Sequence, residues 1–363
     1  MERHDTLARA LQQMLCALDF GAEAPPFPSI DLAVASFAPD GEASWANVLM
    51  SREHRDGLIA TIGAMAGSVT GLRFDCDLRD GALESVAWTA DSDWRTLPFT
   101  PLHGSGAVRV VAPYPASVLK LMVAVGIGLA IDAGLPDWPA ALEPMIVRSD
   151  NDATTELVAL LHRHRLVEIL NRRFADLGLH TLQLHGTTAA GGWRNADGAG
   201  VGMIHMTAWD TVRLLWLLDA QAPPPPWLPA GTTAAPLLQP ATRDHLRAVL
   251  QRQQLDEVLS SGALRGLPDW VPGLPDAPLF AHKTGSTDTY AADAGIVQGP
   301  GSPPLHYIVA VFTSLGRRHA PHARCATTWR LPALGAALHR RLAADALQRA
   351  GDLDAPRSLK EAP

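Results

Sequence analysis

The spacing of hydrophobic positions changes along the chain, with strand-like alternation near both ends and helical spacing in the middle. Alternation predicts a strand at 30–37 and two strands across 71–89, joined by the turn Arg79-Asp80-Gly81. Apolar spacing of three and four predicts helices over 6–18, 116–133, 140–147, 152–162, 166–177, 207–218 and 243–259. The final part of the chain predicts strands at 279–284, 292–297 and 307–313 and a closing helix over 327–347.

The economical assembly of these elements is an α+β fold, an α/β sandwich with a helical lobe. One antiparallel sheet is built from N-terminal and C-terminal strands, and an all-helical subdomain is inserted between them. The expected parts are a leader helix and extension (1–66), a main domain (67–350) and a flexible tail (351–363). Within the main domain we expect the helical lobe over about 117–260 and the sheet from 70–90 and 279–314.

Composition excludes several classes of protein. The 363 residues are 47% hydrophobic and 18% charged, which is typical of a folded chain with a sizeable core. A net charge of -7 argues against nucleic-acid binding, which needs a basic face. No apolar run reaches the roughly 18 residues of a membrane span, and the nearest, 121–135, is broken by Asp132. We therefore expect a monomer that acts on a small molecule, with no nucleic-acid or membrane partner.

The cysteines and the first residues bear on compartment and cofactors. Cys16, Cys76 and Cys325 are odd in number and far apart, so neither a disulfide framework nor a zinc ribbon is indicated. We expect no metal and no cofactor. Residues 1–20 lack the basic start and apolar run of a secretory signal, which predicts a cytoplasmic protein, or a periplasmic one if the start is processed.

Lysine is scarce, and this scarcity singles out two positions. The chain has only three lysines, Lys120, Lys283 and Lys360, and otherwise uses arginine for positive charge. Arginine stays protonated in essentially any environment, whereas a desolvated lysine can lose its proton and act as a base. Lys360 lies in the polar tail, so Lys120 and Lys283 are the two that need an explanation.

The first candidate motif is Ser117-Val118-Leu119-Lys120, at the start of the nearly all-apolar helix predicted over 116–133. Spacing of three places the hydroxyl and the amine on one helix face. The positive end of the helix favours an oxyanion there. A serine hydroxyl needs an adjacent base to act as a nucleophile, and a desolvated lysine can supply it. The structural alternative is a capping serine followed by an incidental lysine.

Two further motifs follow in the chain. Ser149-Asp150-Asn151 lies between two predicted helices, where Ser149 and Asn151 can point into a groove or the three residues can simply cap the next helix. Lys283-Thr284-Gly285-Ser286 ends a predicted strand. An inward lysine there offers fixed positive charge for a carboxylate, and Gly285 lets a substrate backbone come close. The alternative is an ordinary strand end with a turn glycine.

In this order the three motifs resemble the S-x-x-K, S-D-N and K-T-G set of the penicillin-recognising serine hydrolases, and of class A β-lactamases in particular. The resemblance covers roughly residues 70–348 and implies a β-lactamase/transpeptidase-like fold. It also implies hydrolysis of a β-lactam through an acyl-enzyme, a chemistry associated with β-lactam catabolism and antibiotic resistance.

The resemblance implies a role for each motif residue. Ser117 would attack the carbonyl, with Lys120 as base or proton relay. Ser149 would pass a proton to the leaving nitrogen, helped by Lys283. The remaining roles are substrate binding: Asn151 for a side-chain amide, Thr284 with Lys283 for a carboxylate, and the backbone N–H groups of Ser117 and Ser286 for the oxyanion, next to Gly285.

One part of the class A pattern is missing. Those enzymes place a glutamate on the Ω-loop to activate the deacylating water, but no Glu occurs here between Glu168 and Glu257. Asp197 is the nearest acid in the loop, and a solvated turn residue is the better interpretation of it. Ser117 and Ser149 are also only 149 - 117 = 32 residues apart, fewer than in class A enzymes. Acylation is thus better supported than rapid deacylation.

Three functions therefore stay open. The first is hydrolysis of a β-lactam or related cyclic amide with a replaced deacylation apparatus. The second is a D-Ala-D-Ala-type peptidase or an esterase with slow deacylation. The third is a protein that binds β-lactams covalently without turnover.

Overall fold

Alternate residues of the long strands contribute to two separate hydrophobic cores, one on each face of a six-stranded antiparallel sheet. The strands are β1 (Ser29–Phe37), β2 (Ala43–Ser51), β3 (His54–Ile59), β11 (Phe280–Ser286), β12 (Tyr290–Gly299) and β13 (Leu305–Ser314). Their order is β11-β12-β13-β1-β2-β3, so β11 lies at an edge. The computed structural model describes residues 2–18, 29–76, 93–193, 204–228, 237–277, 279–299, 304–314, 321–322, 324–325 and 327–354.

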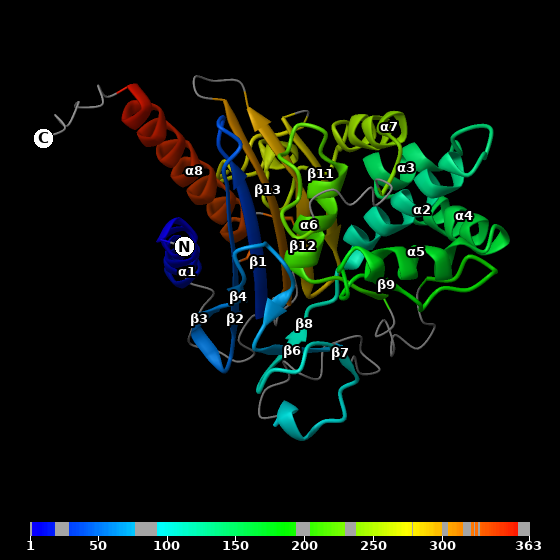
Figure 1. Ribbon diagram of the computed structural model, residues 1–363, viewed down its shortest axis with the longest axis horizontal. Coiled ribbons are helices and arrows are strands. Elements are labelled where there is room, and N and C mark those ends of the chain that lie inside the picture. Colours follow the sequence, from blue (N-terminus) through cyan, green and yellow to red (C-terminus); the bar gives the residue numbers. More distant parts are fainter. Residues whose placement is uncertain are drawn as a thin grey trace, which may run out of the picture.

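One face of the sheet is covered by helices from the two ends of the chain. Helices α1 (Glu2–Ala17) and α8 (Arg330–Asp354) pack side by side on this face (Figure 1). Leu11 and Leu15 of α1 and Leu334 and Leu338 of α8 are fully buried there against even-numbered residues of β1, such as Leu32. Within the described residues, no helix has both the length and the apolar character that crossing a membrane requires.

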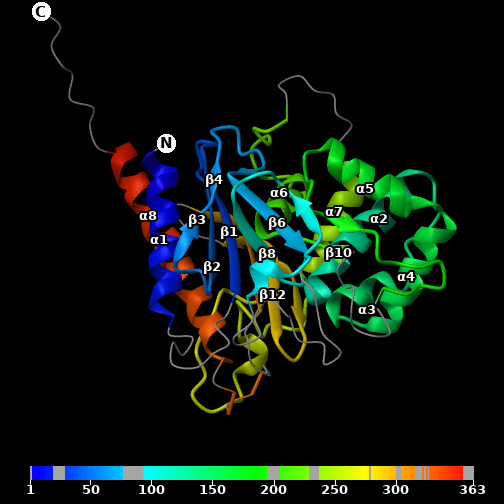
Figure 2. The same ribbon diagram turned by 90° about the horizontal axis from the view of Figure 1, so that it is seen from below.

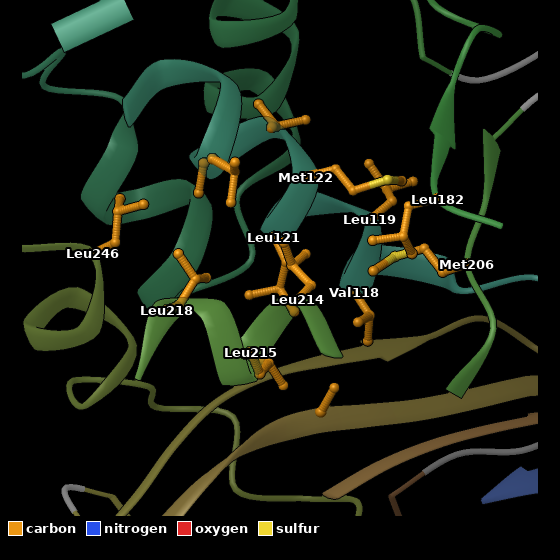
Figure 3. Packing of buried hydrophobic residues seen from close by; sticks show 14 of the residues in the cluster. Val118, Leu119, Leu121, Met122, Leu182, Met206, Leu214, Leu215, Leu218 and Leu246 are labelled. Atoms are coloured by element: carbon orange, nitrogen blue, oxygen red, sulfur yellow. The ribbon is translucent and has the colours of Figure 1, made fainter. Parts of the chain in front are cut away.

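The opposite face carries α6 (Ala208–Leu218) and, beyond it, the helical lobe (Figure 2). The lobe consists of the 3-10 helix η3 (Ala116–Leu119) with α2 (Lys120–Asp132), α3 (Leu142–Val147), α4 (Asn151–Arg163), α5 (Leu166–Asp176) and α7 (Pro240–Leu250). Helix α2 is almost entirely buried because its residues are apolar on every side. Leu214, Leu215 and Leu218 of α6 pack near Leu121 and its neighbours (Figure 3).

Close packing explains the two glycines of α2. A Cβ atom on Gly126 would lie 2.9 Å from Leu161 Cδ2, and one on Gly128 would lie 3.0 Å from Leu238 Cδ1. Both glycines therefore let neighbouring helices approach α2.

Three small sheets lie outside the main one. Strand β6 (Leu72–Cys76) pairs antiparallel with β7 (Pro101–His103) and parallel with β8 (Val108–Ala112). The two-stranded sheets are β4 (Thr61–Ile62) with β5 (Val69–Thr70) and β9 (Gln183–Leu184) with β10 (Ile204–His205). Two further short 3-10 helices are η2 (Trp94–Thr96) and η5 (Gly262–Leu264).

The predicted α+β fold, with a helical lobe inserted between N-terminal and C-terminal strands of one antiparallel sheet, is confirmed. The identity of the N-terminal strands was wrong, because they come from residues 29–59 and not from 70–90. β1 is buried along its whole length and lies between β13 and β2, while β6 belongs to a small sheet. The strand predicted beyond Arg79-Asp80-Gly81 lies outside the described residues.

The helix predicted over 243–259 ends at Leu250. The Gln253 side chain accepts hydrogen bonds from the backbone N–H groups of Gln254 and Leu255, both at 3.0 Å. Those N–H groups are therefore not available to continue the helix, and the chain turns toward β11.

Candidate active site

Ser117 lies in the 3-10 turn η3, which leads directly into α2. In a 3-10 helix residues three apart are eclipsed, so Ser117 and Lys120 share one side of the turn, as their spacing predicts. Ala116, directly before Ser117, has the left-handed φ of 47°, which costs a non-glycine residue about 1–3 kcal/mol. Val118 N donates to Pro115 O at 3.1 Å and closes this tight turn.

Lys120 is fully buried and its ammonium group contacts the Ser149 turn. Nζ donates to Ser149 O at 2.6 Å, to Ser149 Oγ at 3.1 Å and to Asn151 Oδ1 at 2.9 Å. These polar partners replace the water that a buried ammonium group loses. Within the turn, the backbone N–H of Lys120 donates to the carbonyl oxygen of Ser117.

The Ser149 turn caps the next helix and also contacts Lys120. Asp150 is the N-cap of α4 and accepts a hydrogen bond from Ala153 N at 2.8 Å. Ser149 has a left-handed φ of 56°, and it presents both its carbonyl and its hydroxyl oxygen to Lys120. Asn151 is the first residue of α4 and is exposed apart from its contact with Lys120.

Lys283 reaches the same serine from the sheet. Its Nζ donates to Ser149 Oγ at 3.0 Å and to Thr284 O at 2.7 Å, and the residue is fully buried. Burial and the charge of Lys120 hold the pKa of Lys283 well below its usual value, against the opposing effect of Asp293 and Glu257. The Ser149 hydroxyl is thus placed between two lysines from different parts of the fold.

Gly285 brings the edge strand β11 against η3. A Cβ atom at this position would lie 2.6 Å from Ser117 N and 2.8 Å from Pro115 O. Only glycine lets the two backbones approach this closely. Thr284 is buried and Ser286 is exposed, and neither side chain makes a hydrogen bond to a described residue. Their expected roles in binding a carboxylate and an oxyanion stay predictions.

Trp193 is a site residue that the sequence interpretation missed. Its ring centroid lies 5.5 Å from Lys120 Nζ, within the range of a cation–π contact, and its Nε1 donates to Thr155 Oγ1 at 3.2 Å. The ten tryptophans are scattered along the sequence, so their distribution does not single out Trp193. The available signal was an aromatic residue in an otherwise small and polar loop after the α5 helix. Asp197, considered for the same loop, lies outside the described residues.

No group of three or more His, Cys, Asp or Glu side chains is arranged to hold a metal ion among the residues with described positions. The groups that the structure brings together are the two buried lysines and the Ser149 hydroxyl between them, next to the turn that carries Ser117.

The sequence pattern of the beta-lactamase enzyme family matches residues 136–329, more than half of the chain. This range includes Ser149, Asn151 and Lys283 and begins after Ser117. No curated protein matches the chain by sequence.

Solved structures with the same fold include a class A beta-lactamase from Bacteroides cellulosilyticus DSM 14838, which is 17% identical with a TM-score of 0.51. That match covers 93% of this chain and 99% of the other. A beta-lactamase from Sphaerobacter thermophilus DSM 20745 is 15% identical with a TM-score of 0.51, and 93% of this chain and 98% of that chain are covered. At these identities the likeness concerns the fold alone.

Proposed function

The chain belongs to the beta-lactamase enzyme family, and from this membership we propose that it hydrolyses a β-lactam or a related cyclic amide through an acyl-enzyme on Ser117. Family and fold together support a β-lactamase-type serine hydrolase. The observation that carries the proposal is the Ser149 hydroxyl, which accepts hydrogen bonds from both Lys120 and Lys283. Ser149 and the two lysines can pass protons among themselves next to Ser117, which lies directly before the buried helix α2.

In the acylation step, Ser117 Oγ forms a bond to the carbonyl carbon, and its proton passes to the lysine–serine network. The base is Lys120 in its neutral amine form, on the same side of the turn, and once it has taken the proton Ser149 Oγ lies within 3.1 Å. The negative charge on the carbonyl oxygen is met by the backbone N–H groups of Ser117 and Ser286. Each such donor typically contributes 10²–10³ in rate.

The carbon–nitrogen bond of the amide then breaks. Ser149 Oγ donates its proton to the leaving nitrogen and is reprotonated by Lys120 or Lys283, which lie at 3.1 and 3.0 Å. In the final step, water attacks the ester carbon, its proton passes to the network, and Ser117 leaves with a proton restored. The substrate carboxylate would pair with Lys283 and Thr284, and Asn151 would bind the side-chain amide.

Slow deacylation is the second candidate behaviour. The chain has no Glu between Glu168 and Glu257, and the Trp193 ring lies over Lys120 at 5.5 Å. An aromatic ring can shield the ammonium group but cannot accept a proton from water. This observation favours a peptidase or esterase of the D-Ala-D-Ala type, or a protein that binds β-lactams without turnover, over a fast lactamase.

A time course of intact protein mass with benzylpenicillin tests the proposal. We expect an adduct of the mass of the intact antibiotic on the native protein and none on Ser117→Ala. Ser68→Ala is the matched control and should be labelled like the native protein, because Ser68 contacts Gly178 O away from these residues.

The fate of the adduct decides among the candidates. Decay with release of the ring-opened product indicates a lactamase, and persistence indicates a slowly deacylating or non-turnover protein. No adduct on folded protein would overturn the β-lactam proposal. Labelling by an activated ester or a D-Ala-D-Ala peptide, again lost in Ser117→Ala, would then support the esterase or peptidase.

A further inference from the structure

A histidine is buried behind Lys283 between two carboxylates. His282 Nδ1 lies 2.8 Å from Asp293 Oδ1, and His282 Nε2 lies 3.1 Å from Asp256 Oδ1. His282 and Asp293 are both 0% exposed. A neutral imidazole has one donor and one acceptor nitrogen, so it would direct a lone pair at one of these carboxylates. Two ionised carboxylates are both satisfied only by an imidazolium, which donates from both nitrogens.

Other charged groups around the ring are consistent with this state. Burial opposes the charge on His282, but Asp293 and Asp256 outweigh it and raise the pKa of His282 to about 9. Asp276 and Glu257 add negative charge nearby, and Lys283, next in the chain, adds positive charge. The Phe280 ring stacks on the imidazole with centroids 4.0 Å apart.

The imidazolium joins three segments of the chain. His282 lies on β11 and Asp293 on β12, while Asp256 lies in the segment after α7. Asp293 also accepts a hydrogen bond from Leu259 N at 3.0 Å, and Asp256 accepts one from Ser260 Oγ at 2.9 Å. Gly295 leaves the room for this contact, because a Cβ atom there would lie 2.4 Å from His282 Cβ.

Successive side chains of a strand point to opposite faces of the sheet. His282 therefore anchors β11 from the face shared with Phe280, while Lys283 reaches Ser149 on the other face. Movement of the strand at His282 would move Lys283 and Gly285 with it.

We propose that His282 is a positioning residue: as an imidazolium bridging Asp256 and Asp293, it holds β11 where Lys283 reaches Ser149, and loss of its proton releases that strand. The inference rests on the proposed function for its effect on acylation. Above the transition, the neutral ring can donate to only one of the two carboxylates, so the other loses the hydrogen bond that ties its segment to β11.

Side-chain NMR tests the inference without relying on activity. In native protein labelled with ¹⁵N-histidine and ¹⁵N-lysine, one imidazole should keep both nitrogens protonated at pH 7.5 and titrate near pH 9. This signal should be missing in His282→Gln. Because the chain has only three lysines, Lys283 Nζ can be assigned with Lys283→Arg, and it should shift with the same midpoint. A midpoint below pH 7, or a Lys283 signal that ignores the transition, would overturn the inference.

The acylation rate provides the second readout. Measured against pH by intact mass with benzylpenicillin, it should fall at least tenfold as the pH rises through 9 in the native protein. In His282→Gln it should be at least tenfold lower at pH 7.5 and lack this transition. His306→Gln is the matched control. His306 Nε2 lies 2.6 Å from Asp219 Oδ2, and this pair is outside the site, so the variant should leave the pH profile unchanged.

The two readouts separate the possible failures. If the native protein is never acylated, the proposed function fails, while the NMR titration still decides the role of His282. If His282→Gln does not fold, Asp256→Asn removes one carboxylate and should lower the histidine midpoint. An unchanged midpoint in that variant would contradict the bridge.

Discussion

The side-chain nitrogen of Lys283 lies 3.0 Å from the hydroxyl oxygen of Ser149. Lys120 donates to the same oxygen at 3.1 Å. Both lysines are fully buried, so little water screens one ammonium group from the other. Burial and this repulsion keep the pKa of Lys283 well below its usual value, and a substrate carboxylate is the group that would reverse the effect.

Binding of a carboxylate ligand should therefore be accompanied by proton uptake. A negative charge beside Lys283 favours its protonated form and raises its pKa, so a fraction of a proton is taken from solution when the ligand binds near neutral pH. Calorimetric titration in buffers of different ionisation enthalpy measures this fraction. The Ser117→Ala variant allows the measurement with benzylpenicillin without acylation.

Lys283→Arg provides the control, because arginine stays protonated at every pH used. This variant should bind with no buffer-dependent heat from position 283, and its affinity should vary less with pH. If ligand binding by the native protein is accompanied by no proton uptake between pH 6 and pH 9, the inference that a bound carboxylate raises the pKa of Lys283 is wrong.

Gly285→Ala should separate β11 from η3. Its Cβ atom would lie 2.6 Å from Ser117 N, and that atom is backbone, so the strand has to move. We expect the acylation rate to fall by at least tenfold, since misplacement of reacting groups by about 1 Å can cost 10²-fold. Gly299→Ala in β12 is the control, because its Cβ atom meets only Leu305 Cβ at 4.0 Å. Equal acylation rates for the two variants would show that acylation does not depend on the close approach of β11 to η3 at Gly285.

Arg213→Met should destabilise the protein by about 3–5 kcal/mol, because it leaves the charge of Asp210 buried without its partner. Arg213 is 1% exposed, pairs with Asp210 on α6 and donates to Gly178 O at 2.7 Å. Urea unfolding measures the change. Arg252→Met removes a half-exposed pair with Glu143 and should cost only about 0–1 kcal/mol. Similar losses of unfolding free energy in the two variants would show that burial does not determine how much these ion pairs contribute to stability.

Asp31→Asn should change how stability depends on pH. Burial raises the pKa of Asp31 to about 6, although Ala208 N and Asn47 donate to it at 2.9 and 2.7 Å. The folded protein binds this proton more tightly than the unfolded chain, so its stabilising effect is complete at low pH and is lost as the pH rises to about 6.

An asparagine cannot ionise, so the variant lacks this decline. The free energy of unfolding of the native protein, minus that of the variant, should fall by about 2 kcal/mol between pH 4 and pH 7, from a shift of roughly two pKa units. Urea unfolding at several pH values measures the difference. A difference that does not change with pH would show that Asp31 is not buried as described.

The scarcity of lysine pointed to two residues that meet in the folded chain. Lys120 and Lys283 are both fully buried, and both contact Ser149. The sequence indicated that the two motifs come together only through the family resemblance. The short-range part of the site was also predictable, because the spacing of Ser117 and Lys120 within one helical turn is local. The Asp150 cap is local in the same sense.

Long-range pairing was not predictable in the same way. β1 pairs with β13 from Ser29↔Ser314 to Phe37↔His306, and nothing in the local pattern distinguishes this strand from β6. Both alternate, but only tertiary packing decides which joins the larger sheet. His282 was missed for a similar reason, since its two carboxylate partners lie 26 and 11 residues away and meet it only in the folded chain.

The site joins the two halves of the molecule. Lys120 belongs to the helical lobe and Lys283 to the sheet, and Ser149 is hydrogen-bonded to both. A ligand that contacts both sides acts as a brace across this boundary, and it has to leave before lobe and sheet can separate. The proposed function therefore predicts that resistance of the chain to proteolysis rises with occupancy of the site and stays raised for as long as an acyl group remains on Ser117.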